Sequence, residues 1–310
     1  MRYFIAFDGG GTKIESVLFD EYGHIIKRYT GEGGNATDIG KEEALRRLDI
    51  CLQFLLENNP VSIYGLYGGM AGVCPNGDFY SAHVRETLTD TFIRFEDDGC
   101  ILISGGIGPQ DGCGMVCGTG SSLFIRIAGQ PLRHIGGKGY LIDTGGSGFD
   151  LGQHAIRMAL RAVDGRIKPT ILTNLLEEMI GMPINDAVIP VVHRGGRPFI
   201  ASFAKAVFQG RKMGDAVCEE IFQYGAAQLA DLTFTAEKFF DSQFPVVMGG
   251  GVVNSSPEYF KAIKEKSSER AVFFLLDAPP VYGAAVEAMT DANITVSPSF
   301  KEKFLADFYN

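Results

Sequence analysis

The chain opens with an apolar segment that runs into an aspartate and three glycines and then directly into a second apolar segment. Residues 4–20 read FIAFD, GGGTK and IESVLFD around the turn Gly9–Thr12. Consecutive glycines permit a tight turn in which backbone N–H groups can approach an anion closely. The alternating pattern after the turn predicts an antiparallel hairpin, whereas a Rossmann fingerprint requires a helix at this point. The turn also lacks the GxxxxGK[ST] sequence of a Walker A loop.

The order of strand, glycine turn and strand returns about 110 residues further along the chain. Residues 114–135 read GMVC, GTGS, SLFIRI, AGQP and LRHI. Two copies of this strand–turn–strand motif predict two related domains. We place the first at residues 1–113 and the second at 114–294, and we expect a helix at 295–310 to return to the first domain.

Strands alternate with helices behind each meander. We predict helices at 39–57, 82–91, 150–163, 170–180, 199–209, 214–240, 257–268 and 281–289, and strands at 63–66, 92–95, 101–104, 245–248 and 272–275. This alternation indicates an α/β fold with mixed sheets and flanking helices.

The net charge of −9 over 310 residues disfavours broad contact with nucleic acid or an anionic membrane. The six cysteines form no CxxC pair, and Cys113 and Cys117 lie in an apolar stretch typical of small buried thiols. The five histidines show no convincing pairing with acids. The chain enters a strand at once, without the pattern of a signal peptide, so we expect a cytoplasmic protein.

The first glycine turn can bind phosphate through its backbone, and its flanking side chains can add to the site. Thr12 and Lys13 offer polar contacts, and Asp8 at the end of the strand is placed to hold Mg²⁺ through water. A glycine-rich hairpin with a threonine is also common without any ligand. Two more glycine runs favour phosphate binding over an ordinary hairpin. Gly118–Ser122 repeats the first turn, and Gly249–Gly251 follows the apolar run VVM.

In this order the three motifs resemble the phosphate-1, phosphate-2 and adenosine motifs of the actin/hexokinase/Hsp70 superfold. Within it, the sequence is similar to the N-acetylglucosamine kinase and BadF-BadG-BcrA-BcrD-type ATPase family. The matching segments are DGGGTK, GGNATDIG, GMAGV, CGTGSS, VVMGGGVV and PPVYGAA. The resemblance implies two actin-like (ribonuclease H-like) domains with an ATP cleft between them, a homodimer, and phosphorylation of an amino sugar or N-acetylhexosamine.

The resemblance also assigns roles to residues. Asp98, rather than its neighbour Asp97, matches the general base that accepts the proton of the sugar hydroxyl. A solvated acidic turn is the alternative for this pair. ATP and Mg²⁺ are assigned to Asp8, Gly10, Gly11, Thr12, Lys13, Gly118, Thr119, Gly120, Ser121, Gly249, Gly250 and Gly251, and the sugar to Asn35, Ser122, Gly137, Asp143 and Thr144. For Asn35 an ordinary Asx turn is the alternative.

The chain departs from the family pattern on the sugar side. Where the family carries Gly-Asp-Glu-Gly-Ser, residues 143–147 read Asp-Thr-Gly-Gly-Ser, so Thr144 and Gly145 replace the acidic pair. Lys138 also replaces the usual aromatic residue before Gly139. Either Asp143 takes over the acidic role or the substrate differs from free N-acetylglucosamine.

Two other functions stay open. The first is an ATPase that activates a redox enzyme, which would use cysteines for an iron–sulfur cluster, and Cys113 and Cys117 are the nearby pair. The second is a non-catalytic sugar sensor, for which the sequence offers no helix-turn-helix ahead of the first strand.

Overall fold

The computed structural model describes residues 1–58, 62–73, 78–191 and 195–310, and Cys74 and His193 lie outside these ranges. The chain divides into two compact units. The first contains Met1–Asp111, Arg126–Gln130 and Leu276–Asn310, and the second contains Gly112–Ile125 and Pro131–Leu275. We expected the second domain to extend to residue 294, but residues 276–294 pack within the first unit.

The first unit holds a five-stranded mixed sheet in the order β3-β2-β1-β4-β5. β1 is antiparallel to β2 and parallel to β4, and β5 continues the parallel part. The strands are β1 Tyr3–Gly9, β2 Lys13–Asp20, β3 Ile25–Glu32, β4 Ile63–Met70 and β5 Phe92–Glu96, and the helices are α1 Ala36–Ile39, α2 Lys41–Leu56, α4 Phe79–Val84, α5 Asp98–Ile107, α14 Pro280–Asp291 and α15 Pro298–Tyr309.

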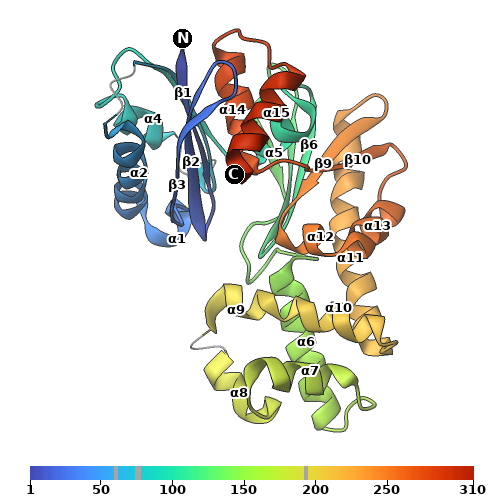
Figure 1. Ribbon diagram of the computed structural model, residues 1–310. Helices are drawn as coiled ribbons and strands as arrows, with labels where there is room; N and C mark the ends of the chain where they lie inside the picture. The colour runs from blue at the N-terminus through green and yellow to red at the C-terminus, as the bar shows by residue number, and fades with distance from the viewer. Residues whose placement is uncertain (59–61, 74–77, 192–194) are drawn as a thin grey trace. The chain divides into compact units, whose positions relative to one another are not determined.

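Both faces of this sheet are buried, because successive side chains of β1 point to opposite sides. Ile5 and Phe7 pack in a core that includes the apolar face of α2. Phe4 and Ala6 pack in a second core with residues of α14 and α15. The carboxyl-terminal helices therefore lie against the amino-terminal sheet (Figure 1).

The second unit repeats the topology of the first. Its sheet has the order β10-β9-β6-β7-β8, in which β6 takes the central place of β1. β6, β9 and β10 are parallel, and β7 and β8 are antiparallel. The prediction of two related domains is thus confirmed. The strands are β6 Gly112–Cys117, β7 Ser121–Arg126, β8 Arg133–Ile135, β9 Phe244–Gly249 and β10 Ala271–Leu275.

The second unit also carries a large set of helices, several of which form a layer of their own (Figure 1). Many begin at a side-chain cap that satisfies a free backbone N–H group, such as Ser147 before α6 and Asp215 before α11. The helices are α6 Gly148–Val163, α7 Ile171–Ile180, α8 Ile184–Pro190, α9 Gly196–Ser202, α10 Ala204–Lys212, α11 Ala216–Ala236 with a 3₁₀ turn Glu237–Phe239, α12 Gly251–Ser255 and α13 Pro257–Lys266.

One predicted strand is wrong. Residues 101–104 belong to α5, which is buried over Gly99–Gly105 and packs against α14. A short, continuously apolar run cannot be assigned to a strand or a buried helix from periodicity alone. In the structure, α5 and α14 pack so closely that a Cβ on Gly283 of α14 would overlap the carbonyl oxygen of Ile101. This contact with α14 accounts for the apolar character of the run. Two smaller differences are that the helix predicted at 82–91 is α4, which ends at Val84, and that the one at 199–209 is divided between α9 and α10.

Candidate functional site

The parallel strands of the first unit end at one edge of the sheet, and the predicted site residues follow from this arrangement. Asp8 lies near the end of β1 opposite Gly69 of β4, and Gly69 pairs with Glu96 of β5. Asp97 and Asp98 continue directly from β5 into α5. Carboxyl ends of parallel strands are the usual place for ligands in α/β sheets. The first unit therefore brings Asp8, the first glycine turn and Asp98 to one edge.

The first glycine turn is held by backbone contacts that exclude larger residues nearby. The N–H group of Gly10 donates to the carbonyl oxygen of Lys13 (3.0 Å), and that of Gly34 donates to the carbonyl oxygen of Gly10 (3.0 Å). A Cβ on Gly33 would overlap the carbonyl oxygen of Gly11. Beside Gly10, by contrast, there is open space, since the nearest atom to an added Cβ would be 4.0 Å away. An approaching anion would meet bare backbone there.

Two acidic residues lie opposite each other next to the first glycine turn, since Asp8 of β1 pairs with Glu15 of β2. Glu15 is buried and is neutralised by Lys13 (2.9 Å) and Arg28 (2.7 Å). Lys13 therefore lies beside the first glycine turn and also forms an ion pair with Glu15. Burial raises the pKa of Asp8 to about 6, against the opposing effect of Lys13, and Glu15 raises it further.

Asp98 is the first helical residue of α5, and Asp97 is its extended N-cap residue, with φ −68° and ψ 150°. The pKa of Asp98 is raised well above its ordinary value. Burial is the largest cause, followed by the charge and hydrogen bonding of Asp97 and by the charge of Asp8. Three carboxyl groups thus repel one another at the end of the sheet, as expected of a place that binds a cation or moves a proton.

These carboxyl groups fit the chemistry of Mg²⁺, which prefers oxygen ligands and keeps several of its waters. Among the residues that the structure describes, no three His, Cys, Asp or Glu side chains are grouped as a direct metal site. Asp8 together with the open side of the glycine turn therefore fits a hydrated ion that also needs phosphate oxygens.

Asn35 has structural partners of its own. Its side-chain oxygen accepts a hydrogen bond from the N–H group of Thr37 (3.0 Å), and its amide group donates to Asp38 (2.9 Å). The Asx-type cap considered from the sequence is thus present. The same oxygen lies next to Gly72, where an added Cβ would be 2.5 Å from it. The segments 33–40 and 69–73, both of which carry the family resemblance, therefore meet at Asn35.

In the second unit, the parallel strands β6 and β9 also end together, and each is followed by a glycine run. A Cβ added to Gly118 would lie 3.7 Å from the backbone nitrogen of Gly251. Gly250 has φ +124°, and a Cβ there would overlap the carbonyl oxygen of Cys117. Only glycine fits this close approach. The second and third glycine motifs are therefore one structural feature.

The second glycine turn is fixed to the start of α6. Gly148 donates its N–H group to the carbonyl oxygen of Gly118 (2.8 Å), and Phe149 donates to that of Thr119 (3.1 Å). The hydroxyl of Ser121 donates to the carbonyl oxygen of Gly145 (2.8 Å). Ser122 lies beside Gly137, whose added Cβ would be 2.7 Å from the Ser122 Cβ. The structure thus joins three predicted segments, 118–122, 137 and 143–148, within one unit.

The loop that has lost the acidic pair is held by backbone and side-chain hydrogen bonds. The backbone N–H group of Asp143 donates to the carbonyl oxygen of Gly139 (2.8 Å), and its carboxylate accepts a long hydrogen bond from the N–H group of Lys138 (3.4 Å). Thr144 is buried, and its hydroxyl donates to Ser147 (3.0 Å). Thr144 therefore serves the α6 cap through Ser147.

An acidic residue that the sequence analysis missed supports this loop. Asp150 accepts a hydrogen bond from the N–H group of Gly146 (2.8 Å) and pairs with His154 (3.2 Å), four residues along α6. The hydrogen bond between Asp150 and His154, together with the charge of Asp150, raises the pKa of His154. The statement that no histidine pairs with an acid is wrong, since His83 also pairs with Asp49 (2.7 Å). The i, i+4 spacing of Asp150 and His154 was the available signal.

The thiols of Cys113 and Cys117 are fully buried in β6. Burial raises the pKa of each to about 12. The thiolate is the form that binds iron, so these residues are poorly suited to hold a cluster. They pack as small apolar side chains, and the redox-activator function gains no support from them.

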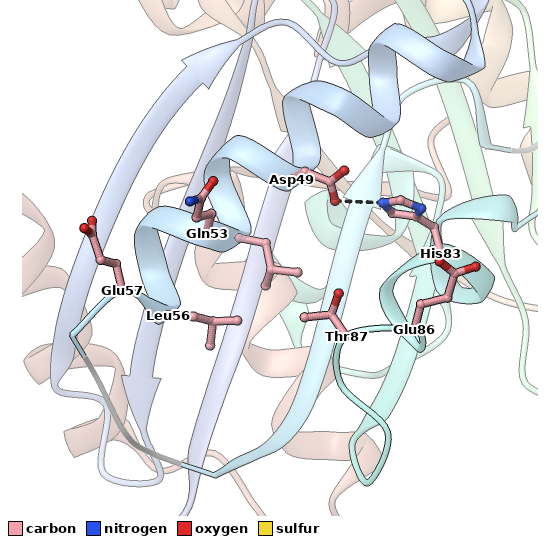
Figure 2. A pocket seen from close by; sticks show the side chains of 8 residues that line it. Asp49, Gln53, Leu56, Glu57, His83, Glu86 and Thr87 are labelled. Carbon is pink, nitrogen blue, oxygen red and sulfur yellow. Dashed lines mark hydrogen bonds and ion pairs between the residues drawn. The ribbon is translucent and has the colours of Figure 1, made fainter.

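A groove elsewhere in the first unit contains none of the predicted residues. It has a volume of about 540 Å³ and is lined by Asp49, Leu52, Gln53, Leu56, Glu57, His83, Glu86 and Thr87. Its lining from α2 and the α4 region carries several carboxylates, and Asp49 and His83 point toward each other (Figure 2). Such a lining repels phosphate.

Comparison with known proteins decides the family. The sequence profile of the BadF/BadG/BcrA/BcrD ATPase family matches residues 7–288. The chain belongs to this ATPase family. The match includes all three glycine motifs and most of both strand meanders. The resemblance stated from the motifs is therefore confirmed, and the protein uses ATP.

Relatives of the chain are similar over most of their length. An N-acetyl-D-glucosamine kinase from Dictyostelium discoideum is 26% identical over 311 residues, which cover 92% of this chain and 97% of that protein. An N-acetylmuramic acid/N-acetylglucosamine kinase from Clostridium acetobutylicum is 28% identical over 271 residues, with 82% and 87% covered.

A solved structure supports the fold. A protein from Chromobacterium violaceum assigned as an N-acetylglucosamine kinase superposes with a TM-score of 0.69 at 21% identity, covering 92% of this chain and 98% of that one. The predicted fold, two actin-like domains that each contain a mixed sheet and flanking helices, is confirmed. No helix in the described ranges combines the length and apolar character needed to cross a membrane.

Proposed function

We propose that the protein is an ATP-dependent kinase that phosphorylates a hydroxyl group of an amino sugar or N-acetylhexosamine similar to N-acetylglucosamine. The observation that carries the proposal is the similarity to curated amino-sugar kinases over 92% of the chain, together with Asp98 at the carboxyl end of β5. We further propose a homodimer located in the cytoplasm.

In this function the sugar hydroxyl attacks the γ-phosphorus of ATP, and the bond from that phosphorus to the β,γ-bridging oxygen breaks to release ADP. Asp98 accepts the hydroxyl proton. Its position at the first turn of a ten-residue helix places backbone N–H dipoles beside its carboxylate. Mg²⁺ bound through water at Asp8 would offset the negative charge of the phosphates and of the three neighbouring carboxyl groups.

The remaining roles are assigned from the segments that come together within each unit. We assign phosphate contacts to Gly10–Lys13 and to Gly118–Ser121, and contacts with the nucleoside to Gly249–Gly251. We assign the sugar to Asn35, Ser122, Gly137, Asp143 and Thr144. The hydroxyl groups of Ser121 and Thr144 already donate hydrogen bonds inside the protein. We therefore assign their contacts with the ligands to backbone groups and to the packing of the side chains. That both turns hold the same ATP stays a prediction.

ADP release tests the proposal directly. Purified protein is incubated with Mg·ATP and, separately, with N-acetylglucosamine, N-acetylmuramic acid, glucosamine and N-acetylmannosamine. We expect one sugar to stimulate ADP release, and Asp98→Asn to abolish the stimulated part. The proposal fails if no sugar in the panel stimulates turnover and Asp98→Asn leaves basal hydrolysis unchanged.

A further inference from the structure

Arg197, at the start of α9, lies against the second glycine turn. A Cβ added to Gly120 would overlap Nη2 of Arg197 and would lie 3.7 Å from the hydroxyl oxygen of Thr144. The guanidinium group therefore covers the part of the turn that glycine leaves bare. Its carbon atom Cζ lies 5.5 Å from the ring centre of Tyr140, so the aromatic ring also positions it.

Among the residues that the structure describes, Arg197 has no acidic partner. Its buried Nε atom also has no hydrogen-bond partner within the described residues. Buried N–H groups are normally satisfied, and an arginine head group that lacks an acid is suited to a bidentate anion. The unpaired guanidinium thus points to an anionic ligand beside Gly120.

The loop that departs from the family pattern lies beside the same glycine turn. Thr144 stands where the family carries the first acid of its acidic pair, and its hydroxyl is beside the same point of Gly120 as Arg197. An acid at position 144 would add a negative charge near the guanidinium, whereas threonine adds none.

We propose that Arg197 binds the terminal phosphoryl group of ATP and stabilises the charge on that group during transfer, which is an additional catalytic role. This rests on the proposed function, since the second glycine turn is taken as a phosphate-binding element. Phosphoryl transfer depends mainly on positioning and on compensation of charge at the equatorial oxygens, which a planar guanidinium supplies through two parallel N–H donors.

Nucleotide binding gives a test that does not need a known sugar. Arg197→Ala and Arg197→Gln are compared with wild type for binding of ADP and of the non-hydrolysable analogue AMPPNP by calorimetry. We expect roughly tenfold weaker AMPPNP binding and nearly unchanged ADP binding, as for loss of one charge-assisted contact to the terminal phosphate. Arg166→Ala, an exposed arginine of the same unit, is the matched control, and thermal unfolding checks that each variant is folded.

Turnover with the sugar gives the second readout. Loss of an arginine that stabilises transition-state charge should lower kcat by about 10²–10³-fold, with a much smaller effect on the KM of the sugar. Arg197→Lys, which keeps the charge but loses the two parallel donors, should recover only part of the rate. Added guanidinium should raise the rate of Arg197→Ala and not that of wild type.

A double-mutant cycle tests the link with position 144. Thr144→Asp should weaken AMPPNP binding more in wild type than in the Arg197→Gln background, because the new carboxylate both repels phosphate and pairs with the guanidinium, and only the second effect requires Arg197. Thr144→Val removes the same hydroxyl bond to Ser147 without adding charge, and it should leave the ratio of AMPPNP to ADP affinity unchanged.

Three outcomes would overturn the proposal. Equal weakening of ADP and AMPPNP assigns Arg197 to another part of the nucleotide. Unchanged nucleotide binding with lower activity only toward N-acetylmuramic acid assigns it to the carboxylate of a sugar acid. No change in any readout removes the residue from the site. If no sugar stimulates turnover while AMPPNP binding still depends on Arg197, the kinase function fails and the phosphate contact stands.

Discussion

The hydroxyl group of Tyr259 in α13 donates a hydrogen bond to the carbonyl oxygen of Gly146 (2.9 Å), 113 residues earlier in the sequence. Both groups are buried, and the thiol of Cys117 makes a second, longer contact with the same oxygen (3.9 Å). Gly146 also receives support from Asp150 at its N–H group. The loop that follows the predicted sugar residues is therefore fixed from three directions.

Removal of the Tyr259 hydroxyl should destabilise the protein moderately. Tyr259→Phe leaves the buried Gly146 oxygen with only the weak thiol contact, so we expect a loss of about 1–2 kcal/mol in the free energy of unfolding. Chemical denaturation measures this loss, and Tyr309→Phe, which alters an exposed ring, serves as control. A change below the error of the measurement would mean that water replaces the hydroxyl.

The choice between the two neighbouring acids is tested by substitution of each. Asp98→Asn should lower kcat about 10²–10⁴-fold because the sugar proton loses its acceptor, while nucleotide affinity changes little. Asp97→Asn removes a repulsive neighbour and should lower the pKa of Asp98, which shifts the acidic limb of the kcat profile to lower pH. If Asp97→Asn abolishes turnover and Asp98→Asn does not, the roles are exchanged.

The first hairpin of the sheet that carries these acids could be predicted from local pattern, but the environment of α5 could not. The hairpin from Phe4 to Asp20 has a glycine turn and alternation within short reach of each other, so its register follows from nearby residues. The run at Ile101–Ser104 is apolar on every side because α14, nearly 200 residues later, covers it. Only the tertiary partner distinguishes this helix from a buried strand.

The candidate site also contains features that local sequence predicts and features that only the folded structure brings together. Glycine motifs and the Asp97–Asp98 pair are contiguous in sequence and were predicted as candidates. Arg197 and Tyr140 are separated from the glycine turn in sequence and meet only in the folded second unit. A second example is the buried carboxylate of Glu287, which forms ion pairs with Arg94 and Arg126 at 2.7 Å. Each arginine is more than 150 residues away from Glu287 in the sequence. Single-sequence pattern carries no information about such pairs.

The raised pKa of Asp8 makes stability depend on pH. A carboxyl group whose folded-state pKa is about 6 and whose unfolded value is near 4 stabilises the fold at low pH, and this contribution is lost as pH rises through 6. Asp8→Asn should therefore raise the unfolding free energy of the nucleotide-free protein by roughly 1–3 kcal/mol at pH 7.5 and by little at pH 4.

Thermal or chemical unfolding at both pH values measures the effect of Asp8→Asn. The exposed acid Asp231, changed to Asn in α11, is the control and should show no such dependence. Mg·ATP should stabilise wild type more than Asp8→Asn, because the variant loses the carboxylate assigned to the hydrated ion. Equal stabilisation of the two proteins by Mg·ATP would remove Asp8 from the metal site.

The third glycine run offers a test of nucleotide contact that leaves the fold intact. A Cβ added to Gly251 would meet no atom within 4 Å, whereas one on Gly250 would overlap the Cys117 carbonyl oxygen at φ +124°. Gly251→Ala should therefore keep the melting temperature, since alanine is also the better helix former at the start of α12. If the nucleoside packs against this bare backbone, the added methyl group should weaken ATP binding about tenfold. Gly250→Ala should instead lower the melting temperature, because the backbone must shift, and an unaltered ATP affinity in Gly251→Ala would place the nucleoside elsewhere.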